Sequence, residues 1–189
     1  MKILTIILVF LLAGCNSGEK EPIQYETTKT ITQEKKEVEI TLGEAVTKII
    51  DTGENRVSNI LVACEKISGT EINPDEEFSF NNITGRKTEK AGYKNAPVIV
   101  DGEKSYGVGG GVCQVSTTIF MAALNANLEI TEHHNHSESV AYAKEGMDAT
   151  VVYGIKDFRF KNNTDKRLYL YVWVKDGTVT AKFVNKILR

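Results

Sequence analysis

Apolar residues recur at helical spacing in two segments of the chain. In the first, about residues 54–67, they lie three or four positions apart at Val57, Ile60, Leu61, Cys64 and Ile67. Such spacing places them on one face of an α-helix, and Gly69 follows as a plausible end. The second segment, about residues 113–126, repeats the pattern with Val115, Ile119, Ala122 and Ala123. The sequence therefore predicts two main helices.

Alternation of apolar and polar residues predicts strands over most of the remaining chain. Phe78 and Phe80 fall on one face of a strand, and Asp101-Gly102 and Asp176-Gly177 are turn dipeptides between extended runs. Strands are expected at 38–42, 78–80, 97–100, 103–106, 128–131, 139–143, 149–153, 157–161, 167–175 and 178–184. The predicted fold class is α+β, mostly antiparallel sheet around a single core.

The N-terminus has the pattern of a bacterial lipoprotein signal. Lys2 precedes an apolar run of about ten residues, which is too short to span a bilayer. Leu12-Ala13-Gly14-Cys15 looks like a lipobox, so residues 1–14 are predicted to be a signal peptide and Cys15 the lipidated residue. The polar segment 15–39 is expected to be a tether, and 40–189 the folded domain. The expected location is the extracytoplasmic face of the cell membrane.

Charge and cysteine content narrow the possible partners. The net charge is -2 and no basic stripe is present, so nucleic acid is not expected as a partner. Cys64 belongs to the apolar face of the first helix and is interpreted as a small core residue rather than half of a disulfide with Cys113.

The segment from Gly109 to Thr118 combines three glycines with a cysteine at the start of a predicted helix. The N–H groups of Gln114, Val115 and Ser116 would favour a thiolate at Cys113 and stabilise an oxyanion. The predicted substrate-binding residues are Gly109, Gly110, Gly111, Gln114, Ser116, Thr117 and, in a separate loop, Arg86. The alternative is that the glycines form a tight turn and the cysteine packs as a small apolar residue.

All three histidines of the protein follow this segment, in His133-His134-Asn135-His136. On a strand, His134 and His136 share a face, so either is a possible general base for Cys113. Groups that could orient the imidazole are Asp148, Asp157, Asn135 and Glu132, although Asp148 also suits a turn. Alternatively, Cys113, His134 and His136 would bind a catalytic Zn²⁺; otherwise no metal or cofactor is expected.

A set of ordered motifs resembles the VanW-like family, over about residues 56–184. The motifs are Phe78-Ser-Phe-Asn81, Thr84-Gly85-Arg86, Gly92-Tyr93, Gly109 to Thr118, His134-x-His136-Ser137, Gly146-x-Asp148-Ala149-Thr150 and Phe160-x-Asn162-Asn163-Thr164. The resemblance implies an exported or membrane-attached protein associated with glycopeptide (vancomycin) resistance. The chain departs from the family pattern at His133, where Arg is usual, and at Asp75, where the family has Gly in Pro-Gly-Glu.

Three functions are consistent with these features. The first is a hydrolase or acyl transferase that uses Cys113, His134 or His136, and Asp148 on peptidoglycan peptide stems or their precursors. The second is a non-catalytic peptidoglycan-binding or accessory module, and the third is a zinc-dependent envelope hydrolase. The sequence leaves open whether the protein is an enzyme.

Overall fold

The computed structural model describes residues 37–100 and 103–188, which lie within one compact unit. Its largest sheet has the strand order β1-β9-β8-β2, with every neighbouring pair antiparallel. The strands are β1 (Glu37–Lys48), β2 (Thr70–Ile72), β8 (Leu168–Lys175) and β9 (Thr178–Leu188). The β8–β9 hairpin turns at Asp176-Gly177, as the sequence predicts.

Two smaller antiparallel sheets complete the strands. One has the order β3-β7-β6, formed by β3 (Glu77–Ser79), β7 (Arg159–Lys161) and β6 (Glu129–Glu132). The other is the predicted hairpin of β4 (Asn95–Val100) and β5 (Glu103–Val108). Its Asp101-Gly102 turn lies outside the described residues.

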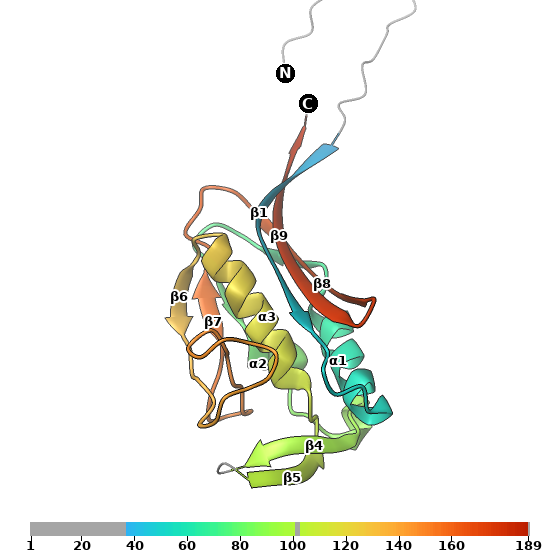
Figure 1. The fold of residues 1–189 in the computed structure, drawn as a ribbon. Helices are drawn as coiled ribbons and strands as arrows, with labels where there is room; N and C mark the ends of the chain where they lie inside the picture. The colour runs from blue at the N-terminus through green and yellow to red at the C-terminus, as the bar shows by residue number, and fades with distance from the viewer. Residues whose placement is uncertain (1–36, 101–102, 189) are drawn as a thin grey trace, which may run out of the picture. The chain divides into compact units, whose positions relative to one another are not determined.

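The helices are α1 (Glu54–Ile67), the short α2 (Phe80–Thr84), a 3-10 turn η1 (Glu89–Ala91) and α3 (Val112–Asn125). Helix α3 packs against β1 and β9 and also against β6 (Figure 1). A helix with neighbours on opposite sides must be buried nearly all round, and ten consecutive or near-consecutive residues from Val112 to Ala123 are buried. Helix α3 therefore lies at the centre of the fold, with most of its N-terminal residues buried.

An aromatic cluster fills the core between α3 and the sheets. Phe78 stacks on Phe160 at 4.7 Å between ring centroids, and Phe183 meets Phe160 edge-on at 5.2 Å. Phe120 of α3 contacts Phe158 edge-on at 5.7 Å. These contacts join both larger sheets to one helix, as expected for a single core.

The α+β class, the antiparallel sheets and both main helices are confirmed, and Cys64 is a buried core residue. The strands predicted at 139–143 and 149–153 are wrong, because both segments are loops apart from an isolated bridge between Val152 and Lys156. At Ala149 the backbone N–H and carbonyl bond to side chains of α3 rather than to a neighbouring strand. Phe80 starts α2 instead of continuing a strand, because Ser79 Oγ caps that helix by accepting from Asn82 N.

The predicted signal peptide, Cys15 and most of the predicted tether lie outside the described residues. None of the helices in 37–100 and 103–188 has the length and apolar content needed to cross a membrane.

Candidate active site

The three glycines before α3 are required by close packing. A Cβ on Gly110 would clash with the carbonyl oxygen of Pro97, and one on Gly111 would lie 2.9 Å from Arg56 Cγ. The loop is also tied to α1, because Asn59 Nδ2 donates to the Gly110 carbonyl at 2.9 Å. Gly111, in the left-handed region at φ 102°, is the N-cap of α3. The loop thus delivers the chain into α3 in one fixed geometry.

Cys113 is the second residue of α3, and its thiol meets the loop segment that follows Asp148. Val151 N donates to Cys113 Sγ at 3.5 Å, and Sγ lies 3.7 Å from both Thr150 Oγ1 and Val151 O. The residue is partly buried. The sulfur is thus held between the N-terminus of a helix and polar backbone groups, a setting that suits a thiolate.

His136 links Cys113 to Asp148. Asp148 Oδ2 lies 2.6 Å from His136 Nδ1 and accepts from His136 N at 2.7 Å, while Oδ1 accepts from Asn135 Nδ2 at 3.0 Å. The His136 ring also lies beside the Cys113 thiol, close enough for each side chain to shift the pKa of the other, and Asp148 engages its Nδ1. The three side chains are arranged as thiol, imidazole and carboxylate, the order used by cysteine nucleophiles.

The environment favours the ion pair of thiolate and imidazolium. Burial alone would raise the pKa of Cys113, but the hydrogen bond and charge of His136, with the Val151 and Thr150 contacts, lower it below its usual value. Burial would likewise lower the pKa of His136, but Cys113 and then Asp148 raise it above its usual value. Asp148 loses solvation on burial too, yet the hydrogen bonds from His136 and Asn135 lower its pKa.

The other two histidines point elsewhere. His133 stacks on Phe120 at 4.1 Å between centroids, and its Nε2 lies 2.7 Å from the Asp148 carbonyl oxygen. His134 Nε2 lies 3.0 Å from Glu132 Oε1, and its side chain is 36% exposed against 14% for His136. His134 and His136 were expected on one face of a strand. The segment is a loop, and His136 is the histidine that acts on the pKa of the thiol.

The polar side chains of α3 hold the site in place. Gln114 is fully buried; its Nε2 donates to Lys48 O at 3.0 Å and its Oε1 accepts from Arg56 Nη2 at 3.1 Å. Ser116 Oγ donates to Ala149 O at 2.6 Å, and Thr117 Oγ1 accepts from Ala149 N at 2.9 Å. These contacts fasten the segment after Asp148 to α3. Direct substrate binding by Gln114, Ser116 and Thr117 stays a prediction.

The sequence predicted the N–H groups of Gln114, Val115 and Ser116 as donors near the thiol, and the structure changes this set. Gln114 N donates to Gly111 O at 3.0 Å and so closes the turn that starts the helix. Cys113 N, in contrast, has no hydrogen-bond acceptor among the described residues. The N–H of the nucleophile itself is therefore a donor free for an oxyanion.

Two side chains on which the charge of Cys113 acts, those of Tyr142 and Lys87, were not predicted from the sequence, which instead indicated Arg86, the neighbour of Lys87. Tyr142 lies in the loop between His136 and Asp148, and burial and then the charge of Cys113 raise its pKa. Lys87 is partly buried and also experiences the charge of Cys113. Arg86, which the sequence suggested, is exposed and lies over the Tyr153 ring at 5.6 Å. Two adjacent basic residues in a polar loop are both expected to be exposed to solvent, so no signal in the sequence indicated that Lys87 is the more buried of the two.

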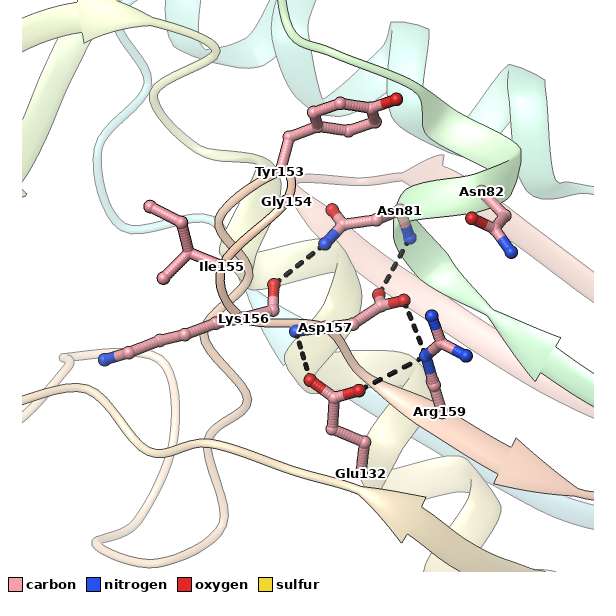
Figure 2. Close-up of a pocket in the computed structure, with 9 residues that line it drawn as sticks. All are labelled: Asn81, Asn82, Glu132, Tyr153, Gly154, Ile155, Lys156, Asp157 and Arg159. Atoms are coloured by element: carbon pink, nitrogen blue, oxygen red, sulfur yellow. Dashed lines mark hydrogen bonds and ion pairs between the residues drawn. The ribbon is translucent and has the colours of Figure 1, made fainter.

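A pocket of about 350 Å³ lies at the far end of the loop segment that contacts the thiol. Figure 2 shows Asn81, Asp157, Glu132 and Arg159 joined across it by hydrogen bonds and ion pairs. Its lining consists of Asn81, Asn82, Glu132, Tyr153, Gly154, Ile155, Lys156, Asp157 and Arg159. Cys113 is not part of this lining, so the pocket neighbours the candidate site rather than containing it.

The geometry does not suit the alternative zinc site. Among residues 37–100 and 103–188, no group of three or more His, Cys, Asp and Glu side chains is arranged to hold a metal ion. His134 is engaged by Glu132 instead of meeting Cys113 and His136. The proposed three-ligand set therefore does not fit the residues as they are placed.

The chain that carries this fold and this thiol–imidazole–carboxylate arrangement matches a known protein family. Residues 55–184 match the family described as VanW like protein, and the chain belongs to that family. This span includes Cys113, His136 and Asp148. No solved structure gives a significant match.

Two curated proteins are similar to this chain. It is 43% identical over 129 residues to the "Uncharacterized protein YoaR" of Bacillus subtilis (strain 168), which covers 68% of this chain and 43% of that protein. It is 30% identical over 139 residues to the "Vancomycin B-type resistance protein VanW" of Enterococcus faecalis (strain ATCC 700802 / V583), covering 70% of this chain and 50% of that protein. The matched region spans about half the length of these relatives.

Proposed function

We propose that this protein is a cysteine-dependent hydrolase or acyl transferase of the cell envelope, with Cys113 as nucleophile, His136 as general acid and base, and Asp148 as the group that orients His136. The observation that carries the proposal is the 2.6 Å contact of Asp148 Oδ2 with His136 Nδ1, on a ring that lies beside Cys113 and lowers the pKa of its thiol. A buried carboxylate placed in this way fixes the tautomer and orientation of an imidazole.

The chemistry follows from these positions. The Cys113 thiolate attacks a peptide carbonyl carbon, and the resulting oxyanion accepts a hydrogen bond from Cys113 N–H. When the tetrahedral intermediate collapses, the C–N bond breaks and the His136 imidazolium gives its proton to the leaving amine, which leaves a thioester on Cys113. His136, now neutral, removes a proton from water or from an acceptor amine, which attacks the thioester; the C–S bond breaks and the Cys113 thiolate leaves, which restores the thiolate–imidazolium pair. Water gives hydrolysis, and an amine gives acyl transfer.

The substrate class rests on similarity. The relative from Enterococcus faecalis is named a vancomycin B-type resistance protein, which supports peptide stems of peptidoglycan or their precursors as the substrate. Membrane attachment through Cys15 on the extracytoplasmic face is part of the same proposal. Cell fractionation of the protein with Cys15→Ala checks it: the variant should leave the membrane fraction, and continued membrane association would refute anchoring at Cys15.

The thiol provides a direct test of the catalytic proposal. Iodoacetamide should alkylate Cys113 of the full chain at pH 7 about tenfold faster than free cysteine, because a thiol with a lowered pKa is more fully ionised. Incubation with peptidoglycan stem peptides should add an acyl mass to the protein, and Cys113→Ala should abolish it. Cys64 is the internal control, because burial raises its pKa to about 12. Labelling of Cys113 no faster than free cysteine, together with no acyl adduct, would refute the proposal.

One observation favours a second candidate function, a non-catalytic peptidoglycan-binding module. The pocket beside Asp157 has room for a ligand, and its lining excludes the thiol. For such a module, Cys113→Ser should leave retention on purified cell wall unchanged while no peptide acylates the protein. A large loss of retention in this variant would contradict the module.

A further inference from the structure

Lys87 is a partly buried cation that forms no ion pair within the described part of the chain, although the charges of Cys113 and Asp157 act on it. Its Nζ donates to Asn81 Oδ1 at 2.9 Å and lies 5.5 Å from the centroid of the Phe80 ring. No carboxylate among the described residues forms an ion pair with Nζ, whereas Arg159, for example, binds three acidic side chains. Burial lowers the pKa of Lys87, because it penalises the charged ammonium, and the charges of Cys113 and Asp157 oppose this effect.

The backbone is shaped to admit the stem of this lysine beside the glycine loop. A Cβ on Gly109 would lie 2.8 Å from Lys87 Cβ and 2.9 Å from Lys87 Cγ. Gly109 begins the loop that leads into α3 and Cys113, so the absence of a side chain there brings Lys87 toward the thiol. Among the charged groups that act on Lys87, Cys113 has the largest effect.

On its other side, Lys87 connects to the pocket. Asn81, which accepts from Lys87, donates through Nδ2 to Lys156 O at 2.8 Å, as Figure 2 shows at the edge of the pocket. The segment that ends at Lys156 passes Val151, whose N–H contacts Cys113 Sγ. Lys87 thus packs against the glycine loop that leads to Cys113 and, through Asn81, reaches the edge of the pocket.

An ammonium has three N–H donors and takes no hydrogen bonds itself. Here one donor is satisfied by a neutral amide, and the charge is partly removed from water, which costs free energy unless an anion compensates. A carboxylate held near Cys113 would accept the remaining donors and neutralise the charge.

We propose that Lys87 forms an anion-binding subsite beside Cys113, which selects substrates that carry a free carboxylate close to the carbonyl under attack. The substrate part of this inference rests on the proposed function; the subsite itself does not. Lys87 is then a specificity-determining residue.

Two alkylating reagents of nearly equal size test the subsite without any substrate. With either reagent the Cys113 thiolate attacks the methylene carbon, an S–C bond forms and iodide leaves. Iodoacetate carries the carboxylate that the subsite would bind, and iodoacetamide is neutral. The preference for an anion is measured as the rate with iodoacetate divided by the rate with iodoacetamide. Both rates at Cys113 are followed by mass spectrometry of the labelled peptide from the full chain.

The wild-type ratio should exceed that of free cysteine, and Lys87→Met should lower it about fivefold, as expected for loss of one nearby charge at low ionic strength. Lys87→Arg should keep most of the preference. Lys90→Met is the matched control: Lys90 is an exposed lysine three positions away, and the ratio should not change.

A ratio in Lys87→Met equal to wild type, or an equal fall in Lys90→Met, would overturn the subsite. If Lys87→Met does not fold, Lys87→Gln replaces it, and a wild-type ratio no higher than that of free cysteine would overturn the subsite without any variant. The iodoacetamide rate alone tests activation of the thiol, so failure of the proposed function and failure of the subsite give different results.

Discussion

Replacing Asp148 by Asn should weaken both the fold and the activation of Cys113. The Asp148 side chain is 8% exposed, and its carboxylate accepts two hydrogen bonds from His136 and one from Asn135. A hydrogen bond to a charged group contributes about 1.5–3 kcal/mol. Asparagine keeps one acceptor oxygen but turns an NH₂ group toward one of the donors. We therefore expect the free energy of unfolding to fall by about 2–4 kcal/mol near neutral pH, since these bonds are not additive.

The pH dependence of this difference follows from the two pKa shifts. The pKa of Asp148 is lowered by its hydrogen bonds, although burial opposes this; its contribution is present above the unfolded value near 3.8 and is lost as the pH falls through the lower folded value. The pKa of His136 is raised by Cys113 and Asp148 against burial; its contribution is complete below the unfolded value near 6.5 and is lost as the pH rises through the higher folded value. The stability difference between wild type and Asp148→Asn should therefore be greatest between about pH 4 and pH 6.5.

Urea unfolding followed by the fluorescence of Trp173, the only tryptophan, measures this difference at a series of pH values. In parallel, the pH profile of iodoacetamide labelling should show a higher pKa for Cys113 in the variant and about tenfold slower labelling at pH 7. Asp165→Asn removes an exposed carboxylate and should change stability by less than about 0.5 kcal/mol, with no effect on labelling. Equal behaviour of the two variants would refute the assigned role of Asp148.

Two further predictions follow from the structure. Replacing His136 by Asn should slow iodoacetamide labelling of Cys113 at pH 7 about tenfold or more. The same change at His134, which bonds Glu132, should alter the labelling rate less than about twofold. Equal effects of the two variants would contradict His136 as the general base. In urea unfolding, Gly43→Ala should destabilise the fold by about 3 kcal/mol or more, because its Cβ would lie 2.5 Å from a carbonyl oxygen of α3. Gly53→Ala should cost less than about 1 kcal/mol, because its Cβ would meet only an exposed side chain at 3.2 Å. A Gly43→Ala variant as stable as Gly53→Ala would show that β1 can move away from α3.

Local patterns predicted the helices better than the loops around the thiol. The 3.6-residue period of α1 and α3 is a property of consecutive residues, and both helices formed within two residues of their predicted ends. The segment 149–153 also alternates, but Ser116 and Thr117 supply the partners that a neighbouring strand would otherwise supply. The hydrogen-bond partners of this segment could not be predicted from its own residues.

The site shows the same division. Cys113 at a helix start and a histidine near it were readable from the sequence, and so was Asp148 as one of several possible orienting groups. Spacing on a presumed strand grouped His134 with His136, but the chain turns as a loop and directs His134 to Glu132. Lys87 was missed in favour of Arg86 because burial of a lysine depends on Gly109, which is 22 positions further along the sequence.

The sequence by itself determined the fold class, the two main helices, the family and the position of the thiol, since each follows from residues close together in the chain or from ordered motifs. The tertiary structure alone decided that His136 rather than His134 acts on Cys113, that Asp148 is the carboxylate bound to His136, and that Lys87 packs against the glycine loop before the thiol. These choices depend on side chains from separate segments meeting around the N-terminus of α3. Such contacts are set by packing across the whole fold, so the helix or strand periodicity of neighbouring residues does not predict them.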